Sequence, residues 1–214
     1  MKHMFWLLVL TLALPVAAFA NSVNFTNSSG TLSGSTAGLS LSDSILIAVN
    51  GLGGLGLVTG DLGSLTLSTG ALTSGSLKMG GTFAGGGSFV IMGNGTGGIP
   101  NGVIFNGIFS GPVTWSLITL GDGSHLYTLT GSLAGTWYTG VTVDGATIQL
   151  TVDVGKGFFK GRATIASGDT NISAIPESST LTLIGAGLVG LAGLSRHKMK
   201  KTSVILRDDR PRLA

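Results

Sequence analysis

Strict alternation of apolar and polar side chains runs through residues 146–154, which read Ala146-Thr147-Ile148-Gln149-Leu150-Thr151-Val152-Asp153-Val154. Because successive side chains of a β-strand point to opposite faces, this pattern predicts a strand with one buried and one solvated face. The pair Asp144-Gly145 precedes the run and follows Val141-Thr142-Val143. Since Asp-Gly accepts the positive φ angles of tight turns, we expect a β-hairpin that turns at this pair.

The same alternation recurs through much of residues 21–174. In four further runs the apolar residues lie an even number of positions apart. These runs contain Phe89 and Ile91; Phe105 and Phe109; Val113, Trp115 and Leu117; and Tyr127, Leu129, Leu133 and Trp137. A second turn sequence, Gly121-Asp122-Gly123-Ser124, separates two of these runs. About ten to twelve such runs, spaced by about eight to twelve residues, predict an all-β fold, a Gly-rich antiparallel sandwich or barrel of short strands.

Glycine makes up 37 of the 214 residues, and 33 of these lie between residues 21 and 174. This content argues against a mainly helical protein, because glycine weakens helices. We expect turns or loose loops at Gly80-Gly81 and Gly85-Gly86-Gly87, and a long exposed loop over residues 94–102. Residues 30–98 are the most glycine-rich and least regular, so a β-solenoid is the alternative there, although no fixed repeat period is found.

Composition and charge exclude several classes of protein. A hydrophobic fraction of 43% and a mean hydropathy of +0.51 argue against disorder. The absence of cysteine excludes a disulfide scaffold, a zinc ribbon and a thiol catalyst. The formal charge of +3 arises at the chain ends, since residues 21–174 hold six Asp, three Lys and one Arg, a net charge of −2. That balance disfavours nucleic-acid binding.

The N-terminal segment has the organisation of a secretory signal peptide. Lys2 and His3 precede an apolar run over residues 4–14, and small residues at Ala18 and Ala20 flank Phe19. A short basic flank, an apolar core and a small-x-small site together predict cleavage after Ala20 and export of the mature chain.

The C-terminal segment has three parts. Pro176-Glu177 comes first, and the apolar stretch Leu181 to Leu194 follows. A basic cluster ends it, made of Arg196, Lys198, Lys200 and Lys201. The 18 residues from Ser178 to Ser195 span about 27 Å as a helix, close to the roughly 30 Å hydrocarbon core of a bilayer. We therefore expect a transmembrane helix of marginal length with a cytoplasmic basic flank that acts as a stop-transfer cluster.

This order of parts resembles the PEP-CTERM protein-sorting domain, in which a Pro-Glu-Pro motif, a Gly/Leu-rich helix and a basic cluster stand at the C-terminus. The matching residues are Pro176 and Glu177, Leu181 to Leu194, and Arg196 to Lys201. Two departures are Ser178 at the third motif position and the basic extension 202–214. The resemblance implies processing by an exosortase, an inner-membrane cysteine protease, in an exopolysaccharide-producing Gram-negative bacterium.

Two motifs suggest catalytic or nucleotide chemistry and have simpler explanations. Gly51-Leu52-Gly53-Gly54-Leu55-Gly56 matches the dinucleotide pattern, but Thr59-Gly60-Asp61 follows too soon for a phosphate-binding helix, so we expect a Gly-rich β-loop. Asp122, Ser124 and His125 supply the residue types of a hydrolase triad, yet they lie on and beside a turn, where sequence neighbours diverge. We expect no enzyme activity and no cofactor.

The candidate residues for a metal site and for glycan binding are scattered along the sequence. Asp122, Asp144 and Asp153 are too dispersed to predict a calcium loop, so we expect no metal site. Four aromatic residues are candidates for stacking on sugar rings, Trp115, Tyr127, Trp137 and Tyr138. The simpler interpretation is core packing plus one exposed ring, because Trp137 and Tyr138 are adjacent and one should face outward.

The sequence thus predicts five segments. They are a signal peptide at 1–20, a Gly-rich β domain at 21–166, a polar linker at 167–174, a sorting signal with a transmembrane helix at 175–201, and a basic extension at 202–214.

We expect an exported cell-envelope or extracellular-matrix protein with a structural or exopolysaccharide-associated role. Its expected partners are the export machinery, an exosortase, the inner membrane through the C-terminal helix before processing, and exopolysaccharide, but not nucleic acid. After processing it should lie at the cell surface or outside the cell. The alternatives are a carbohydrate-binding module that uses exposed Trp or Tyr, and a secreted hydrolase.

Overall fold

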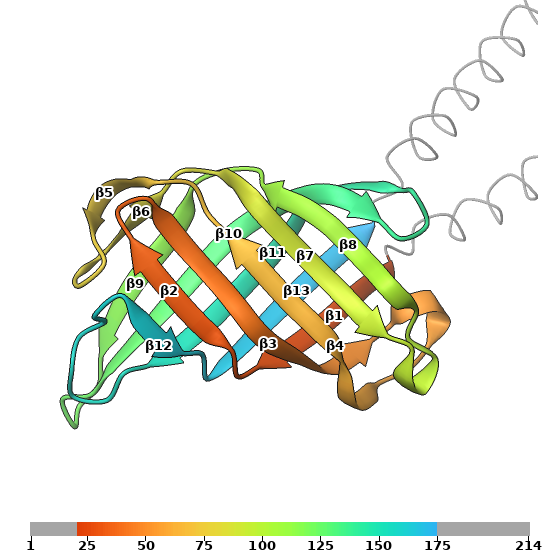
Figure 1. Cartoon of the computed structure of the whole chain (residues 1–214), viewed down its shortest axis with the longest axis horizontal. Helices are drawn as coiled ribbons and strands as arrows, with labels where there is room; N and C mark the ends of the chain where they lie inside the picture. Colours follow the sequence, from red (N-terminus) through yellow and green to blue (C-terminus); the bar gives the residue numbers. More distant parts are fainter. Residues whose placement is uncertain (1–20, 175–214) are drawn as a thin grey trace, which may run out of the picture. The chain divides into compact units, whose positions relative to one another are not determined.

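Antiparallel strands form one sheet that closes on itself in the computed structural model, which describes residues 21–174 (Figure 1). The strands are β1 (Asn21–Ser28), β2 (Thr31–Ser35), β3 (Gly38–Asn50), β4 (Val58–Ser68), β5 (Leu72–Ser76), β6 (Gly80–Phe83), β7 (Gly86–Asn94), β8 (Asn101–Phe109), β9 (Val113–Thr119), β10 (His125–Trp137), β11 (Thr142–Asp153), β12 (Arg162–Thr164) and β13 (Ser167–Ala174). Two short 3-10 helices, η2 (Leu52–Gly54) and η3 (Thr96–Gly98), lie in loops. The all-β prediction is confirmed, and of its two architectures the barrel is the one found.

Several of these strands are consecutive segments of one longer strand, interrupted by a bulge or a few irregular residues. β8 and β9, for example, both pair antiparallel with β10, from Phe109↔Leu133 to Thr114↔Thr130 across Gly111-Pro112. Joined in this way, the segments form a closed eight-stranded antiparallel barrel in which each long strand lies beside the next one in the chain. The segmentation explains why 13 strands are found where the sequence predicts ten to twelve.

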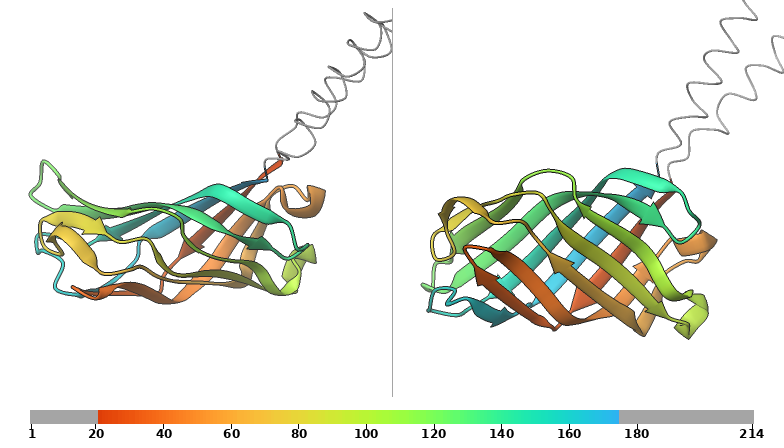
Figure 2. Two further views of the ribbon diagram at one scale, coloured as in Figure 1. Left: turned by 90° about the horizontal axis from the view of Figure 1, so that it is seen from above. Right: turned by 45° about the horizontal axis from the view of Figure 1, so that its top comes forward.

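The barrel closes between its first and last strands. β13 pairs with β1 from Asn21↔Ala174 to Asn27↔Gly168, and on its other side it pairs with β11 (Figure 2). The predicted linker at 167–174 is therefore wrong, and the β domain extends to Ala174. The segment looks like a linker because Ile172 is the only large apolar side chain among its three inward positions, which also hold Gly168 and Thr170.

Apolar side chains from the inward positions fill the barrel. The largest fully buried ones are Trp115, Tyr127, Phe25, Phe83, Phe89, Phe105 and Phe109. Inward glycines leave room for these rings: a Cβ atom on Gly131 would lie 2.7 Å from Phe109 Cδ1, and one on Gly135 would lie 2.8 Å from Phe105 Cζ. Small and large residues thus alternate to fit the interior of a small barrel. This accounts for part of the glycine content.

One of the two predicted turns is confirmed and the other is wrong. Gly121–Ser124 joins β9 to β10, and Leu120 N donates to Ser124 O at 2.9 Å. Asp144-Gly145 lies within β11, at a register shift opposite Leu133 and Ala134. The hairpin turns instead at residues 138–141, where Trp137 N donates to Val141 O at 2.8 Å. A β-bulge places Gly145 at φ 86°, so it uses the same backbone conformation that a tight turn needs.

The glycine-rich half is more regular than expected. Gly80 and Gly81 begin β6 and pair with β5, and Gly86 begins β7 and pairs with Phe109, so these residues are not in loose loops. Gly85 lies in the short connection between β6 and β7, as expected, and Gly87 lies at an irregularity within β7. The up-and-down order of the strands there excludes a solenoid. The expected long loop over 94–102 is reduced to residues 95–100, because β7 ends at Asn94 and β8 begins at Asn101.

The features predicted at the two chain ends lie outside the part of the chain that the structure describes. The predicted signal peptide at 1–20 with its cleavage site at Ala18 and Ala20 lies outside the described residues. So do the sorting motif, the apolar stretch 181–194, the basic cluster 196–201 and the extension 202–214. Between residues 21 and 174, no helix is long and apolar enough to cross a membrane.

Candidate functional site

An open groove of about 780 Å³ lies on the outer face of the barrel, and it is lined mainly by side chains of β1, β13, β11 and β10. Figure 2 shows β13 lying between β1 and β11 in this part of the sheet. Outward positions on half-buried strands are polar, so the groove is lined by amide and hydroxyl groups. The sequence predicts the polar face of each strand but not which of these faces meet.

The strand register aligns these side chains into two rows that cross the sheet. The first row follows the pairs Asn50↔Asn24, Asn24↔Asn171, Asn171↔Thr147 and Thr147↔Ser132. The second row follows the pairs Thr26↔Asp169, Asp169↔Gln149, Gln149↔Thr130 and Thr130↔Thr114. Neighbours within a row are about 4.8 Å apart, the spacing of paired strands, and each row therefore presents a regular series of hydrogen-bonding groups.

Hydrogen bonds between neighbours hold part of these rows in place. Asn171 Nδ2 donates to Asn24 Oδ1 at 2.6 Å, and Thr26 Oγ1 donates to Asp169 Oδ1 at 2.9 Å. Thr147 and Gln149 project from β11 as exposed side chains. The β1–β13 side of the groove is therefore pre-organised, which lowers the entropy lost when a ligand binds.

The chemistry of the lining selects for a neutral ligand rich in hydroxyl groups. Asn and Gln amides both donate and accept hydrogen bonds, as Thr and Ser hydroxyls do. Among residues 21–174, Asp169 is the only charged side chain that lines the groove, and no Lys or Arg side chain does. Leu57 and Pro112 add apolar contacts to the lining. An anionic ligand would find no cation here, whereas a neutral polyol would find many partners.

Two of the four candidate glycan-binding aromatic residues lie inside the barrel. Trp115 stacks on Tyr127 with ring centroids 4.9 Å apart, and Phe159 meets Trp115 edge-on at 5.3 Å. The exposed fractions of Trp115 and Tyr127 are 1% and 0%, so neither is accessible to a glycan outside the barrel. This corrects their assignment as glycan contacts. In the sequence, Trp115 lies two residues from Val113 and Tyr127 lies two residues from Leu129, and both of these neighbours are buried. This two-residue spacing on a strand indicates an inward position.

These aromatic rings close one end of the barrel by holding two loops. Trp115 Nε1 donates to Leu77 O at 3.0 Å in the β5–β6 turn. Tyr127 Oη donates to Lys78 O at 2.6 Å and accepts from Phe159 N at 3.2 Å in the β11–β12 loop. We call Trp115, Tyr127 and Phe159 the aromatic plug. Its role is structural, since its polar atoms are used within the fold.

The other two aromatic residues lie at the opposite end of β10. Trp137 is half-buried, with its ring centroid 5.9 Å from Phe25 and 6.2 Å from Phe105. Tyr138 follows directly and is 42% exposed. The prediction that one member of this pair faces outward is confirmed. The four aromatic candidates are thus divided between two ends of the barrel and form no single stacking platform.

The residue types of a hydrolase triad do not assemble into one. Asp122 Oδ1 accepts hydrogen bonds from Ser124 Oγ at 2.6 Å and from Ser124 N at 2.9 Å, which stabilises the β9–β10 turn. These bonds from Ser124 hold the pKa of Asp122 below its usual value. His125 instead stacks on Phe158 at 4.3 Å, with Nδ1 2.8 Å from Gly157 O. The imidazole is therefore directed to the β11–β12 loop and not to Ser124.

The glycine motif at 51–56 forms a loop, as predicted. Its only helix is η2, which spans three residues, and β4 begins at Val58. No longer helix follows to direct its N-terminal amides at a phosphate. Within residues 21–174, the His, Asp and Glu side chains form no group of three that could hold a metal ion.

Comparison of the chain with family models, with curated proteins and with solved structures finds no match. The geometry of the barrel and the two end segments are therefore the features that indicate a function.

Proposed function

We propose that this is an exported, non-catalytic protein of the cell envelope or extracellular matrix, and that the outer groove of its barrel binds exopolysaccharide. The observation that carries the proposal is the pair of cross-strand rows of amide and hydroxyl side chains. The groove replaces the aromatic residues as the candidate glycan-binding surface.

The dimensions of the rows fit a polymer better than a small molecule. The first row crosses five neighbouring strands, β3, β1, β13, β11 and β10, and so extends for about 20 Å. An open surface of this length can contact several sugar units in succession, each through its hydroxyl groups. Many weak, water-exposed hydrogen bonds would give moderate affinity and tolerance of irregular polymers, which suits a matrix component.

The end segments supply the sorting part of the proposal. The signal peptide starts export, the apolar stretch 181–194 holds the chain at the inner membrane, and an exosortase cleaves near Pro176-Glu177. The fold supports this order because β13 ends at Ala174, just before the motif. Cleavage at Pro176-Glu177 would remove the tail and leave every strand of the barrel in place.

The groove is tested by the double variant Thr147→Ala with Gln149→Ala. Loss of about two hydrogen bonds, each contributing about 0.5–1.5 kcal/mol, should weaken binding to purified exopolysaccharide by roughly 5- to 150-fold. Calorimetric titration of the polysaccharide gives the dissociation constant. The control is Thr66→Ala with Asn106→Ala, which removes two exposed polar side chains of β4 and β8 outside the groove. Equal affinities for the two double variants would contradict the groove as the binding surface.

The sorting step is tested by intact mass. We expect the protein recovered from the cell surface or medium to begin at Asn21 and to end close to Pro176-Glu177. Residues 178–214 should be absent, because processing removes the apolar stretch and the basic cluster. A surface-released chain that still ends at Ala214 would overturn this part of the proposal.

A further inference from the structure

Three loops at one end of the barrel carry no Asp, Glu, Lys, Arg or His side chain. They are residues 51–57, 95–100 and 138–141, and we call them the uncharged loops. They lie close together: a Cβ atom on Gly98 would lie 3.5 Å from Leu55 Cδ1, and one on Gly53 would lie 3.8 Å from Tyr138 Oη. The nearest charged residues in sequence are Asp61 in β4 and Asp144 in β11, on the strands behind them.

Large apolar side chains project from the uncharged loops. Leu57 is 68% exposed, Val141 is 51% exposed, and Leu55 is 36% exposed. Tyr138 adds an aromatic ring with a polar tip, a side chain favoured at membrane–water interfaces. Other large apolar side chains are exposed elsewhere on the barrel, among them Met79, Met92 and Ile108. The uncharged loops differ in that four such side chains project from neighbouring loops with no charged side chain among them, which indicates a partner that is itself apolar.

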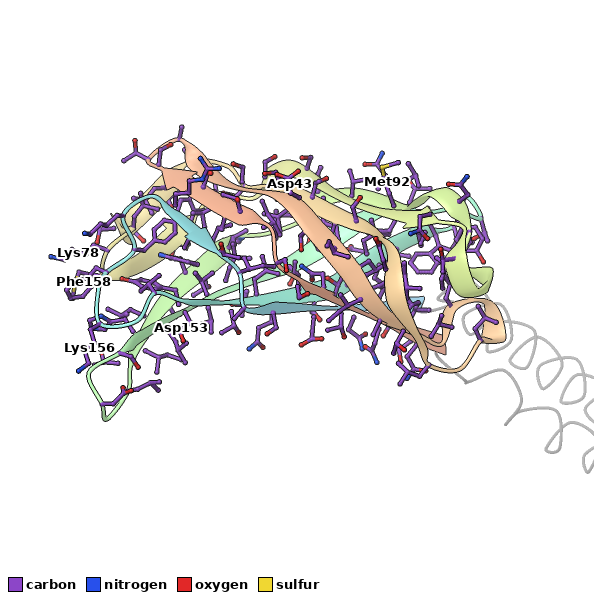
Figure 3. All side chains as sticks on the ribbon, turned by 60° about the horizontal axis from the view of Figure 1, so that its bottom comes forward. Asp43, Lys78, Met92, Asp153, Lys156 and Phe158 are labelled. Atoms are coloured by element: carbon purple, nitrogen blue, oxygen red, sulfur yellow. The ribbon has the colours of Figure 1, made fainter. Side chains whose placement is uncertain are left out.

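The opposite end of the barrel has the reverse character. The four Lys and Arg residues between 21 and 174 are Lys78 in the β5–β6 turn, Lys156 and Lys160 in the β11–β12 loop, and Arg162 at the start of β12. Figure 3 shows Lys78, Phe158 and Lys156 together at this end, and Lys78 Nζ lies 4.5 Å from the centre of the Phe158 ring. Asp122 and Asp153 also lie at this end, but the four Lys and Arg residues outnumber these two carboxylates, so we call it the cationic end.

The described chain enters and leaves at the apolar end. Asn21 pairs with Ala174, and a Cβ atom on Gly51 of the first uncharged loop would lie 2.8 Å from Ser22 O. The apolar stretch at 181–194 begins seven residues after Ala174. An extended segment of that length reaches at most about 25 Å. A bilayer that holds the stretch would therefore lie within reach of the uncharged loops.

We propose that the uncharged loops form a lipid-contacting surface, through which the barrel rests on the bilayer while its tail is still anchored. This inference rests on the membrane anchoring in the proposed function and adds an orientation to it. Leu57, Tyr138 and Val141 enter the interfacial region, and the cationic end faces away from the membrane. The outer groove then lies on the side of a barrel standing on the membrane.

The absence of cysteine allows a clean test with single labels. Leu57→Cys carries an environment-sensitive fluorophore at the apolar end, and Met79→Cys, at a residue that is 62% exposed, carries the same label at the cationic end. The full chain is reconstituted in phosphatidylcholine vesicles that contain lipids with a nitroxide quencher on the acyl chain. We expect quenching at position 57 to be several-fold greater than at position 79. Val141→Cys provides a second site at the apolar end if the label at 57 perturbs the fold.

Each outcome bears on the inference. A chain that floats with the vesicles but is quenched equally at positions 57 and 79 overturns the lipid contact and leaves the anchor intact. A chain that does not float removes the anchor and the lipid contact together. A label at 57 that is protected from an aqueous quencher, but not quenched by the lipid nitroxide, shows that protein and not lipid covers the surface, and also overturns the inference.

Discussion

A chain that covers residues 21–174 is expected to fold, whereas a chain that ends at Ser167 is expected to lose the barrel. The shorter chain lacks the β13 residues that pair with β1 from Asn21 to Asn27 and those that pair with β11 around Thr147. Two strands then become open edges with unpaired N–H and C=O groups, and water reaches the part of the core that Ile172 covers in the complete barrel. Circular dichroism and cooperative urea unfolding distinguish the two chains.

This prediction also tests where the sorting tail can be cut. If the chain ending at Ala174 unfolds with the same cooperativity as the full chain, processing near Pro176 leaves a complete domain. Equal midpoints for the chains ending at Ser167 and Ala174 would show that β13 contributes nothing to stability and that the barrel is closed in some other way.

Trp115→Ala is expected to lower the free energy of unfolding by about 3–5 kcal/mol, a large part of the stability of a domain of this size. The substitution removes a fully buried ring that stacks on Tyr127 and contacts Phe159, and it leaves a cavity at the plugged end. It also leaves Leu77 O without its hydrogen bond from the indole. The midpoint of urea unfolding measures the loss.

The control for this variant is Tyr138→Ala, which removes an exposed aromatic ring at the other end of the barrel. Its effect on stability should be within about 0.5 kcal/mol, as for most surface substitutions. A shift for Trp115→Ala no larger than that of Tyr138→Ala would mean that the aromatic plug is not part of the stabilising core.

The surfaces of the barrel divide its proposed tasks. The aromatic plug closes the cationic end and ties down the β5–β6 and β11–β12 loops. We propose that the outer groove binds a polysaccharide through its rows of hydroxyl and amide groups, and that the uncharged loops face the bilayer before processing. An inward side chain such as Trp115 affects stability, whereas an outward one such as Gln149 affects binding. Variants on the two faces should therefore separate the two properties.

Much of the fold is predictable from local pattern. The two-residue period of residues 146–154 predicts both the strand and its inward face. The same alternation on their own strands places Trp115 and Tyr127 in the core. The turn at 121–124 is also correct, because its backbone requirement is local. Asp144-Gly145 is misassigned because a bulge and a turn use the same glycine conformation.

The candidate site is less predictable, because it depends on register between distant strands. The hydrogen bond from Asn171 to Asn24 joins residues 147 positions apart, and no local pattern specifies that they are neighbours. β13 is missed for the same reason, since a short strand with one large apolar side chain is recognisable only between two partners.

The sequence by itself determined which side chains face inward and which face outward, because that choice follows from the two-residue period of a strand. It also contains apolar and basic segments at the two chain ends, and these segments predict export and anchoring. Tertiary structure alone decided that β1 and β13 close the sheet, and so which polar faces form the groove. Closure of the barrel pairs the two ends of the domain. The register of β1 against β13 is set by backbone hydrogen bonds between residues far apart in the sequence, so no local pattern can specify it.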